Sequence, residues 1–341
     1  MKIVDSTRLF VGLDYHQDFV QVCVLDEQGK VRMNSKVEND WRKIAAAVPV
    51  GSTVQVALEA CCGAADLADE LAERAGWSVS LAHPGFVARM KQNPDKTDYS
   101  DARLLADLLR VGYLPKVWLA PAELRELRRL VRFRQQKVNE RRNVKLRIRA
   151  LLRDHRQQLL DLEANPWTKK WLAHLVTLGE LGADTQWILQ EHLASLERLN
   201  VEIRQVERRL AGRVADDAVV QKLRQQKGIG LVTAATMRAE IGRFDRFRTG
   251  KQLARFCGLT PRNCSSGNRQ ADAGVIRAGN PQLRAVLVEA VHRIMRCDAR
   301  WMRLAQQLRG RGKHACVVVA AIANRYVRWL HHQMQPTALA V

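Results

Sequence analysis

The succession of strand and helix patterns in the first 82 residues is the feature that most restricts the fold of this chain. Three strand-like segments come first, and a helix, a strand, a helix and a further strand follow them. The expected segments are Arg8–Leu13, Phe19–Leu25, Val31–Val37, Trp41–Val48, Thr53–Leu58, Ala64–Ala75 and Ser78–Ala82. A meander that leads into alternating helices and strands is typical of a mixed sheet covered by helices. The sequence therefore predicts an α/β domain in this region.

The rest of the chain is expected to be mainly helical. Pro121 to about Leu162 contains no proline or glycine after its first residue, and its apolar residues recur at helical steps, which indicates a long amphipathic helix or a helix pair. A second amphipathic stretch, Leu189 to Leu210, could pair with the first as an antiparallel coiled coil or supply a subunit interface. Because 341 residues are too many for one ordinary core, we predict three domains, at 1–118, 119–215 and 216–341.

The charge of the chain favours a polyanionic partner. Lysine and arginine number 56 against 35 aspartate and glutamate residues, a net charge of +21, and nucleic acid is the leading candidate. An anionic membrane surface is the alternative, although no run approaches the ~18 apolar residues of a spanning helix. Thirteen basic residues lie between Arg125 and Arg156, against four acidic residues between Glu123 and Asp154. This excess favours a surface that follows phosphates over a merely solvated helix face.

The cysteines and the first residues indicate a cytoplasmic protein. The seven cysteines are irregularly spaced and include no C-x-x-C pair, which argues against a disulfide framework and against a zinc site. Reduced thiols fit this pattern best. Residues 1–10 do not resemble a signal peptide, because a strand-like stretch follows them without a small-residue cleavage site.

Four carboxylates stand where metal chemistry would need them. Asp14 and Glu59 end two strands, while Asp98 and Asp101 open a helix that runs to about Arg110. Strand-end carboxylates converge at one edge of a sheet, and residues three apart share one helix face. Together the four acids could hold two Mg²⁺ ions ~3.5–4 Å apart, an arrangement used for in-line displacement at phosphorus. The alternative is that the strand-end acids are turn residues and the helix-opening pair only caps its helix.

Two loop motifs stand out in the C-terminal region. The triplet Gly228-Ile229-Gly230 resembles the turn of a helix-hairpin-helix, whose backbone amides can meet a phosphate; a plain tight turn between helices is the alternative. Ser265-Ser266-Gly267 lies between Arg262 and Arg269, and is a flexible, hydroxyl-bearing loop in a basic setting. Its alternative is an ordinary surface turn, because serine and glycine are common in turns for backbone reasons.

Taken in order along the chain, these motifs resemble the insertion-sequence-110-type transposases, RNA-guided bridge recombinases with an Asp-Glu-Asp-Asp site. The matching segments are Gly12-Leu13-Asp14, Leu58-Glu59-Ala60, His83-Pro84, Lys96-Thr97-Asp98-Tyr99-Ser100-Asp101-Ala102-Arg103, Gly228-Ile229-Gly230, Gly258-Leu259-Thr260-Pro261, Ser265-Ser266-Gly267 and Arg277-Ala278-Gly279-Asn280-Pro281-Gln282-Leu283-Arg284. The chain departs from the family pattern at Cys61-Cys62-Gly63, where a hydroxyl residue usually precedes the glycine, and at Asn268-Arg269.

The resemblance implies a fold, a set of site residues and partners. The fold is a ribonuclease-H-like domain of the Holliday-junction-resolvase kind, followed by a helical coiled coil and a small helical transposase domain. The four metal-binding acids are Asp14, Glu59, Asp98 and Asp101, with Mg²⁺ as the ion, and the nucleophile lies in Ser265-Ser266, at Ser266 by preference. The partners are donor and target DNA, a noncoding bridge RNA and further copies of the chain, as a dimer to a tetramer, with no membrane.

The mechanism that follows is attack of Ser266 on a DNA phosphodiester, which gives a phosphoserine link that a free 3′-hydroxyl later reseals. Two alternatives stay open. In the first, the acids alone form a junction-resolving nuclease and Ser266 is a turn residue. In the second, the protein binds RNA or DNA without catalysis. A sugar kinase or an actin-like ATPase would share strand patterns with this fold, but the charge and the missing phosphate-binding glycine loops oppose that reading.

Overall fold

The computed structural model describes residues 8–91, 97–155, 165–176, 181–263, 272–276 and 278–335. The chain separates into two compact units, residues 1–120 and 121–341. The stretches expected at 119–215 and 216–341 therefore fall almost entirely within the second unit, and their division into two domains stays a prediction. Within the described residues, no helix is both long enough and apolar enough to cross a membrane.

The first unit is built on a six-stranded sheet. Its strands are β1 (Arg8–Tyr15), β2 (Phe19–Leu25), β3 (Val31–Glu38), β4 (Thr53–Glu59), β5 (Ser78–Ala82) and β6 (Lys116–Val117). The strand order is β3-β2-β1-β4-β5-β6. Strands β1 to β3 pair as an antiparallel meander, β4 lies parallel to both β1 and β5, and β6 runs antiparallel to β5. The predicted mixed sheet is confirmed, and the two-residue strand β6 is an addition to it.

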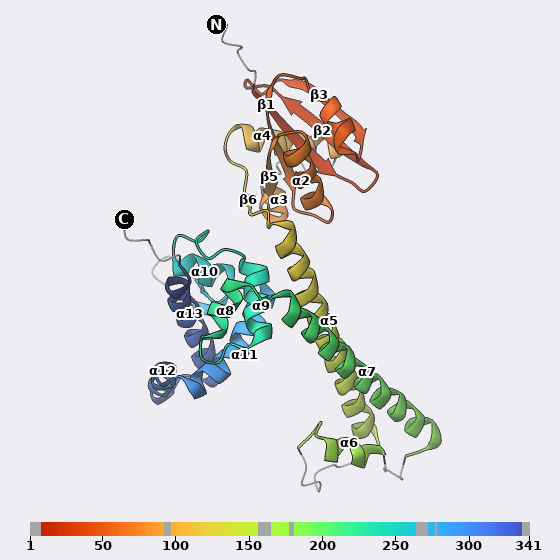
Figure 1. The fold of residues 1–341 in the computed structure, drawn as a ribbon, viewed down its shortest axis with the longest axis vertical. Coiled ribbons are helices and arrows are strands. Elements are labelled where there is room, and N and C mark those ends of the chain that lie inside the picture. The colour runs from red at the N-terminus through yellow and green to blue at the C-terminus, as the bar shows by residue number, and fades with distance from the viewer. Residues whose placement is uncertain are drawn as a thin grey trace. The chain divides into compact units, whose positions relative to one another are not determined.

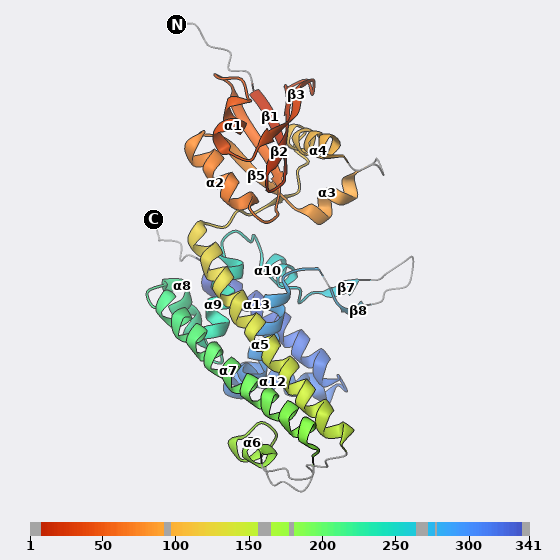
Figure 2. The same cartoon turned by 90° about the vertical axis from the view of Figure 1, so that its right-hand side faces the viewer.

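Helices cover both faces of this sheet (Figure 2). One face packs against α1 (Trp41–Ala46) and α2 (Ala64–Arg74), and the other against α3 (Pro84–Met90) and α4 (Asp98–Arg110). The central strands are buried on both sides, so they read as apolar runs rather than as a strict alternation. In β1, for example, Val11 and Leu13 belong to the core under α1 and α2, whereas Phe10 belongs to the core under α4.

Gly12 lets α4 lie directly on the backbone of β1. A Cβ atom at this position would overlap the carbonyl oxygen of Ala102 and would lie 2.6 Å from the amide nitrogen of Ala106, both in α4. Any larger side chain at Gly12 would push the helix away from the sheet. The glycine therefore fixes how closely the middle of α4 approaches β1.

In the second unit, two long helices run side by side in opposite directions (Figures 1 and 2). They are α5 (Ala122–Asp154) and α7 (Ala183–Arg213), and α6 (Lys169–Val176) packs at their distal end through Trp171 and Leu175. The helix expected to run to about Leu162 ends at Asp154, and residues 156–164 lie outside the described part of the chain. Whether the pair supercoils as a coiled coil stays a prediction.

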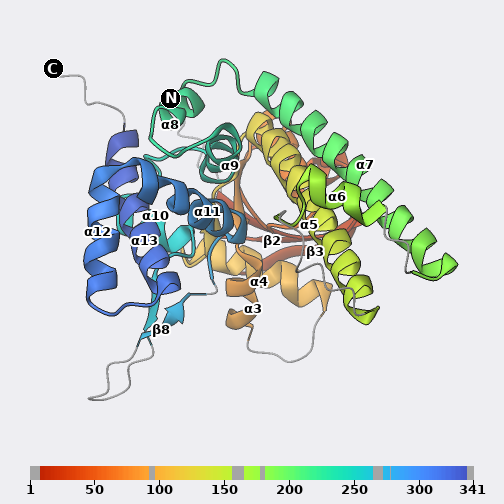
Figure 3. The ribbon, with the colours of Figure 1, turned by 90° about the horizontal axis from the view of Figure 1, so that it is seen from below.

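The remaining helices form one cluster (Figure 3). They are α8 (Ala218–Arg224), α9 (Leu231–Ile241), α10 (Gly250–Phe256), α11 (Pro281–Cys297), α12 (Ala299–Gly310) and α13 (Ala315–Met334). A short antiparallel hairpin, β7 (Pro261–Asn263) with β8 (Asp272–Val275), interrupts the helices. The expected helical character of this region is therefore correct, but the hairpin was not predicted.

Candidate active site and metal centre

The sheet brings Asp14 and Glu59 to the face that α4 covers. Side chains two apart in a strand point to the same face, so Asp14 lies on the side of Gly12, which contacts α4. Gly12 is paired with Ala57 in the parallel register of β1 and β4, and Ala57 is buried in the core beneath α4. Glu59, two residues after Ala57, follows onto the same face. The register and the alternation thus place both strand-end acids beneath the beginning of one helix.

The first turn of α4 supplies the other two acids. Thr97 caps the helix, because its hydroxyl accepts a hydrogen bond from the amide of Ser100. Asp98 and Asp101 follow in the first turn, where the positive end of the helix dipole favours carboxylates. The Asp101 side chain is 11% exposed and that of Asp98 is 33% exposed. Capping and metal binding are therefore compatible roles for this pair.

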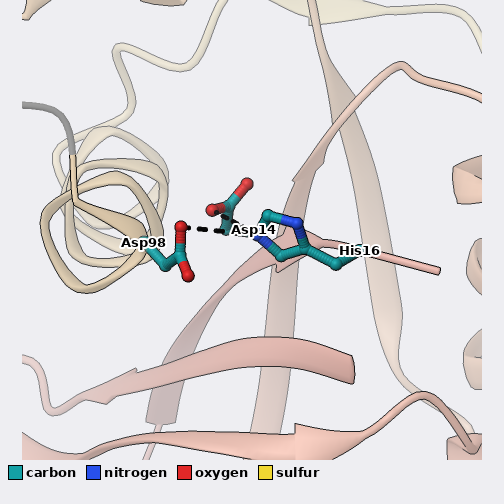
Figure 4. Close-up of side chains that lie close together, drawn as sticks. All are labelled: Asp14, His16 and Asp98. Atoms are coloured by element: carbon teal, nitrogen blue, oxygen red, sulfur yellow. Dashed lines mark ion pairs between the residues drawn. The ribbon is translucent and has the colours of Figure 1, made fainter. Parts of the chain in front are cut away.

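His16 completes a compact group with two of the acids (Figure 4). Its Nε2 atom lies 3.3 Å from Oδ2 of Asp14 and 3.5 Å from Oδ1 of Asp98. One ligand atom from each residue falls within 4.8 Å of the others, which is a spacing that could hold a metal ion. The ring stacks on Phe19 with 4.5 Å between ring centroids. The sequence reasoning missed His16, although a histidine two positions after a strand-end aspartate lies on the same face and could have been noticed.

Two lysines form ion pairs with the acids of α4. The Lys91 ammonium lies 2.7 Å from Oδ2 of Asp101, and the Lys36 ammonium lies 3.3 Å from Oδ2 of Asp98. Lys36 also sits over the ring of Phe19, 4.3 Å from its centroid. The acid group therefore draws cationic groups from β3 and from the end of α3. A divalent cation would compete with both lysines for these carboxylates.

The electrostatics of Asp14 also fit a cation site. Burial raises the pKa of the Asp14 carboxyl, and the nearby charges of Asp101 and Asp98 raise it further, while His16 opposes them. A carboxyl with a raised pKa carries its negative charge at a cost, and a bound cation removes that cost. Carboxylate oxygens are the ligands that Mg²⁺ prefers, and an imidazole is suited to transition metals as well. The residues present fit a divalent metal ion.

Glu59 and Asp101 border the compact group rather than belong to it. Among the described residues, only Asp14, His16 and Asp98 form a cluster tight enough to share one ion. Burial raises the pKa of the Cys61 thiol, and the charges of Glu59 and Asp14 add to this shift. Glu59 and Asp14 are therefore both close to the exposed Cys61 side chain, which follows the end of β4. The compact group of Asp14, His16 and Asp98 is therefore the geometry on which a metal site can be built.

The serine candidates cannot be placed beside the acids. Ser265 and Ser266 lie outside the described residues, as do Gly267 and Arg269. The strands β7 and β8 flank this stretch in the chain, and Arg262 in β7 is exposed. The nucleophile therefore stays a prediction from the sequence.

Packing explains the first glycine of the Gly228-Ile229-Gly230 turn. Gly228 has a φ of 83°, and a Cβ atom there would lie 2.7 Å from Cγ1 and 2.9 Å from the amide nitrogen of Ile294 in α11. The Arg293 side chain donates a hydrogen bond to the carbonyl oxygen of Gly228. Close contact with α11 requires a glycine at position 228, whereas a Cβ atom at Gly230, which caps α9, would meet nothing within 4 Å.

The basic run on α5 divides into two halves. In the first half, most arginines and lysines pair with side chains far along the chain: Arg132 with Glu240, Arg134 with Glu207 and Lys137 with Glu202. In the second half, Lys145 and Arg149 pack over the Trp167 ring. Arg142 and Arg147 are exposed, and neither has an ion pair with a described residue. Only the second half of α5 therefore keeps free cations for phosphates.

Comparison with known proteins gives two matching family models. The model described as "Transposase IS116/IS110/IS902 family" matches residues 220–307, and a second model described as "Transposase", of the Asp-Glu-Asp-Asp type, matches residues 11–156. The second match contains Asp14, Glu59, Asp98 and Asp101, and the first contains Ser265 and Ser266.

Similar proteins cover nearly the whole chain. A "Probable family 20 transposase" of Pseudomonas aeruginosa is 29% identical over 94% of this chain and 95% of its own length. The transposase for insertion sequence element IS1111A of Coxiella burnetii is 24% identical over 94% of this chain and 88% of its own. The transposase for insertion sequence element IS1328 of Yersinia enterocolitica is 26% identical over 80% of this chain and 81% of its own.

Proposed function

The chain belongs to the transposase family of the insertion sequences IS116, IS110 and IS902, and on this premise we propose that it cuts and rejoins DNA with a divalent-metal site and a serine nucleophile. The metal ligands would be Asp14, Glu59, Asp98 and Asp101, with Mg²⁺ as the ion, and Ser266 would be the nucleophile. The family acts on DNA, so DNA is the substrate.

One observation carries the metal site. Asp14 and Glu59 lie on the sheet face that α4 covers, and Asp98 and Asp101 occupy the first turn of that helix. Asp98 and Asp101 are close enough to Asp14 to raise its pKa. When bound, the ion would polarise the scissile phosphate and stabilise the charge on the leaving oxygen. His16, within 3.5 Å of both Asp14 and Asp98, would supply a nitrogen ligand or orient the two carboxylates.

The covalent step follows from the chemistry of serine. The Ser266 hydroxyl oxygen attacks phosphorus, the bond from phosphorus to the 3′-oxygen breaks, and the proton passes from the serine to the departing 3′-oxygen through a base or water. The 3′-hydroxyl of another strand then attacks the phosphoserine and releases the serine. The phosphodiester energy is conserved in the link, so the reaction needs no ATP. The acids and Ser266 belong to separate units of the chain.

The partners are proposed on the same basis. A noncoding bridge RNA would pair with the donor and target DNA, and a dimer to tetramer would bring two reacting strands together. The net charge of +21 fits polyanionic partners of this kind. Action on chromosomal DNA would place the protein in the bacterial cytoplasm, at the nucleoid.

The metal site is tested by Asp14→Asn, which keeps the size of the side chain and removes its charge. We expect strand exchange to be abolished while affinity for DNA is nearly unchanged, because the acids act on the reacting phosphate. Asp66→Asn is the matched control, since Asp66 is an exposed acid in the first turn of α2, on the opposite face of the sheet. Strand exchange by Asp14→Asn, or wild-type activity in EDTA, would contradict the metal site.

A metal-only nuclease is the second candidate. It is favoured by one observation: the acid cluster is assembled within the first unit alone. The two candidates differ in the fate of Ser266→Ala. A serine recombinase loses both cleavage and its protein–DNA adduct, which a denaturing gel and peptide mass would detect on the wild type. A metal-only nuclease continues to cut and never forms the adduct.

A further inference from the structure

A groove of about 890 Å³ lies beside the acid cluster in the first unit. It is lined by the end of α3 and by one side of α4, together with the residues that follow α4. Asp101 lies in its wall, so the groove opens onto the carboxylates described above. Nothing in the proposed cleavage chemistry accounts for the rest of this groove.

One face of α4 packs against the sheet, and the other lines the groove. Ala102, Leu105, Ala106 and Leu109 are buried against the sheet. Residues spaced by three and four positions on the other side line the groove, among them Ser100, Arg103, Leu104, Asp107, Leu108 and Val111. Asp101 stands at the boundary between the two faces. A molecule lying along the groove would therefore pass directly beside the acid cluster.

The cations of the groove are suited to phosphates. Arg89 and Arg103 are exposed, and neither makes an ion pair with a carboxylate of a described residue. The acid Asp107, in contrast, is already paired with Arg110. Lys91 is held by Asp101 and would be released if a cation took its place. The guanidinium groups of Arg89 and Arg103 therefore line the same groove as Asp101, and no carboxylate of a described residue pairs with either.

The apolar rim of the groove is suited to an unpaired base. Tyr113 is 73% exposed and Val111 is 50% exposed at one end. Phe86 does not line the groove, but its ring is 49% exposed and lies 5.5 Å from the guanidinium of Arg89, which does. An exposed aromatic ring in a groove that also carries arginines is typical of surfaces on which single-stranded bases stack.

From these observations we propose that the α3–α4 groove binds one unpaired nucleic-acid strand next to the metal site. Arg89 and Arg103 contact its phosphates, and Tyr113 stacks on a base. The inference rests on the proposed function, because it assigns a path to the DNA strand whose phosphate reaches the acids. A single strand is favoured over a duplex since the aromatic faces are useful only where bases are unpaired.

Salt dependence measures the phosphate contacts. Each contact with a single strand contributes about 0.7 to the slope of log affinity against log salt. Arg89→Ala combined with Arg103→Ala should therefore lower the slope for a labelled single strand by about 1.4 in EDTA. Arg74→Ala, an exposed arginine in the last turn of α2, is the matched control and should change the slope by no more than one contact. An unchanged slope in the double variant would overturn the phosphate contacts.

Photo-crosslinking tests the position of the base. A single strand that carries 5-iodouracil should form an adduct with Tyr113, identified by peptide mass. An excess of unlabelled single strand should remove this adduct, while duplex of the same sequence should not. Tyr113→Ala should weaken single-strand binding about fivefold or more, and Tyr113→Phe should restore it, because phenylalanine keeps the stacking face. Equal competition by duplex, or no adduct at Tyr113, would refute the single-strand groove.

The two proposals fail in different ways. If Asp14→Asn abolishes strand exchange while the Arg89 and Arg103 variants bind and react as the wild type does, the groove is wrong and the proposed function stands. If the Tyr113 adduct forms but activity survives in EDTA, the groove stands and the metal mechanism is wrong.

Discussion

Glu240 in α9 is expected to be the acid whose charge matters most for the stability of the second unit. Its side chain is 2% exposed. The Arg132 guanidinium binds it in a two-point fork at 2.8 and 3.0 Å, and the Asn280 side-chain amide donates to it at 2.7 Å. Arg128 lies 3.5 Å away, and burial lowers its pKa while Glu240 raises it again. Glu240→Gln keeps the shape of the side chain and removes this charge.

The magnitude follows from the burial of the partners. Breaking a fully buried ion pair costs about 3–5 kcal/mol, because a charge is left without compensation. Here the Arg132 side chain is 50% exposed and that of Arg128 is 24% exposed, so both can regain water. We therefore expect a loss of about 2–3 kcal/mol. For a unit of this size, that corresponds to a fall in Tm of roughly 4–12 °C.

The assay is thermal unfolding of the full chain, followed by circular dichroism at 222 nm. Glu207→Gln is the matched control: Glu207 also pairs with an arginine of α5, Arg134, but its side chain is 35% exposed. The Glu207 carboxylate keeps far more contact with water than that of Glu240, so we expect its pair to contribute about 1 kcal/mol. If Glu240→Gln lowered Tm no more than Glu207→Gln, the reasoning from burial would be refuted.

Three further predictions concern the acid cluster and α5. The pKa of Asp14 is raised in the folded protein, so ionisation of this carboxyl lowers the stability of the fold as pH rises through that pKa. Asp14→Asn should therefore raise Tm at neutral pH without metal, and should abolish the stabilisation that added Mg²⁺ gives the wild type. A lower Tm of the variant without metal would contradict this. Gly12→Ala should lower the free energy of unfolding by about 1–3 kcal/mol and weaken metal binding in a calorimetric titration, because α4 must move away from β1. An unchanged affinity for the metal would contradict this role of Gly12. Arg142→Ala combined with Arg147→Ala should lower the slope of log affinity against log salt for duplex DNA by up to about 1.8. Arg134→Ala should leave this slope nearly unchanged, because the Arg134 guanidinium is paired in the wild type. Equal slopes in both variants would show that this part of α5 does not contact phosphates.

The sheet could be predicted because its strands carry the information locally. The apolar runs from Arg8 to Leu25 and from Thr53 to Leu58 give both the strands and their ends, and the acids at those ends follow. The register of β1 with β4 then brings Asp14 and Glu59 to one side, which the sequence reasoning anticipated from topology alone. Helix α3 was missed, although Pro84 at its first turn is a known start signal.

The partners of the acids could not be predicted, because they come from distant parts of the chain. Lys36 lies in β3 and Lys91 follows α3, and neither position carries a local sign that it will face an aspartate. His16 is different, because its position two residues after Asp14 could have been noticed, although its contact with Asp98 still depends on where α4 lies. The position of these partners depends on how α4 packs on the sheet, which Gly12 permits because it has no side chain.

The number of basic residues in α5 overstates how many of them are free to contact phosphates. Thirteen cations in one stretch suggest a continuous path for phosphates, yet Glu202, Glu207 and Glu240, which lie beyond the run in the chain, take up much of its first half. An ion pair within the fold and a phosphate compete for the same guanidinium, so each paired arginine contributes little to the release of counterions. Arg142 and Arg147 on α5 make no ion pair with a described residue, so their removal should change how nucleic acid binds, as should removal of Arg89 and Arg103 in the α3–α4 groove.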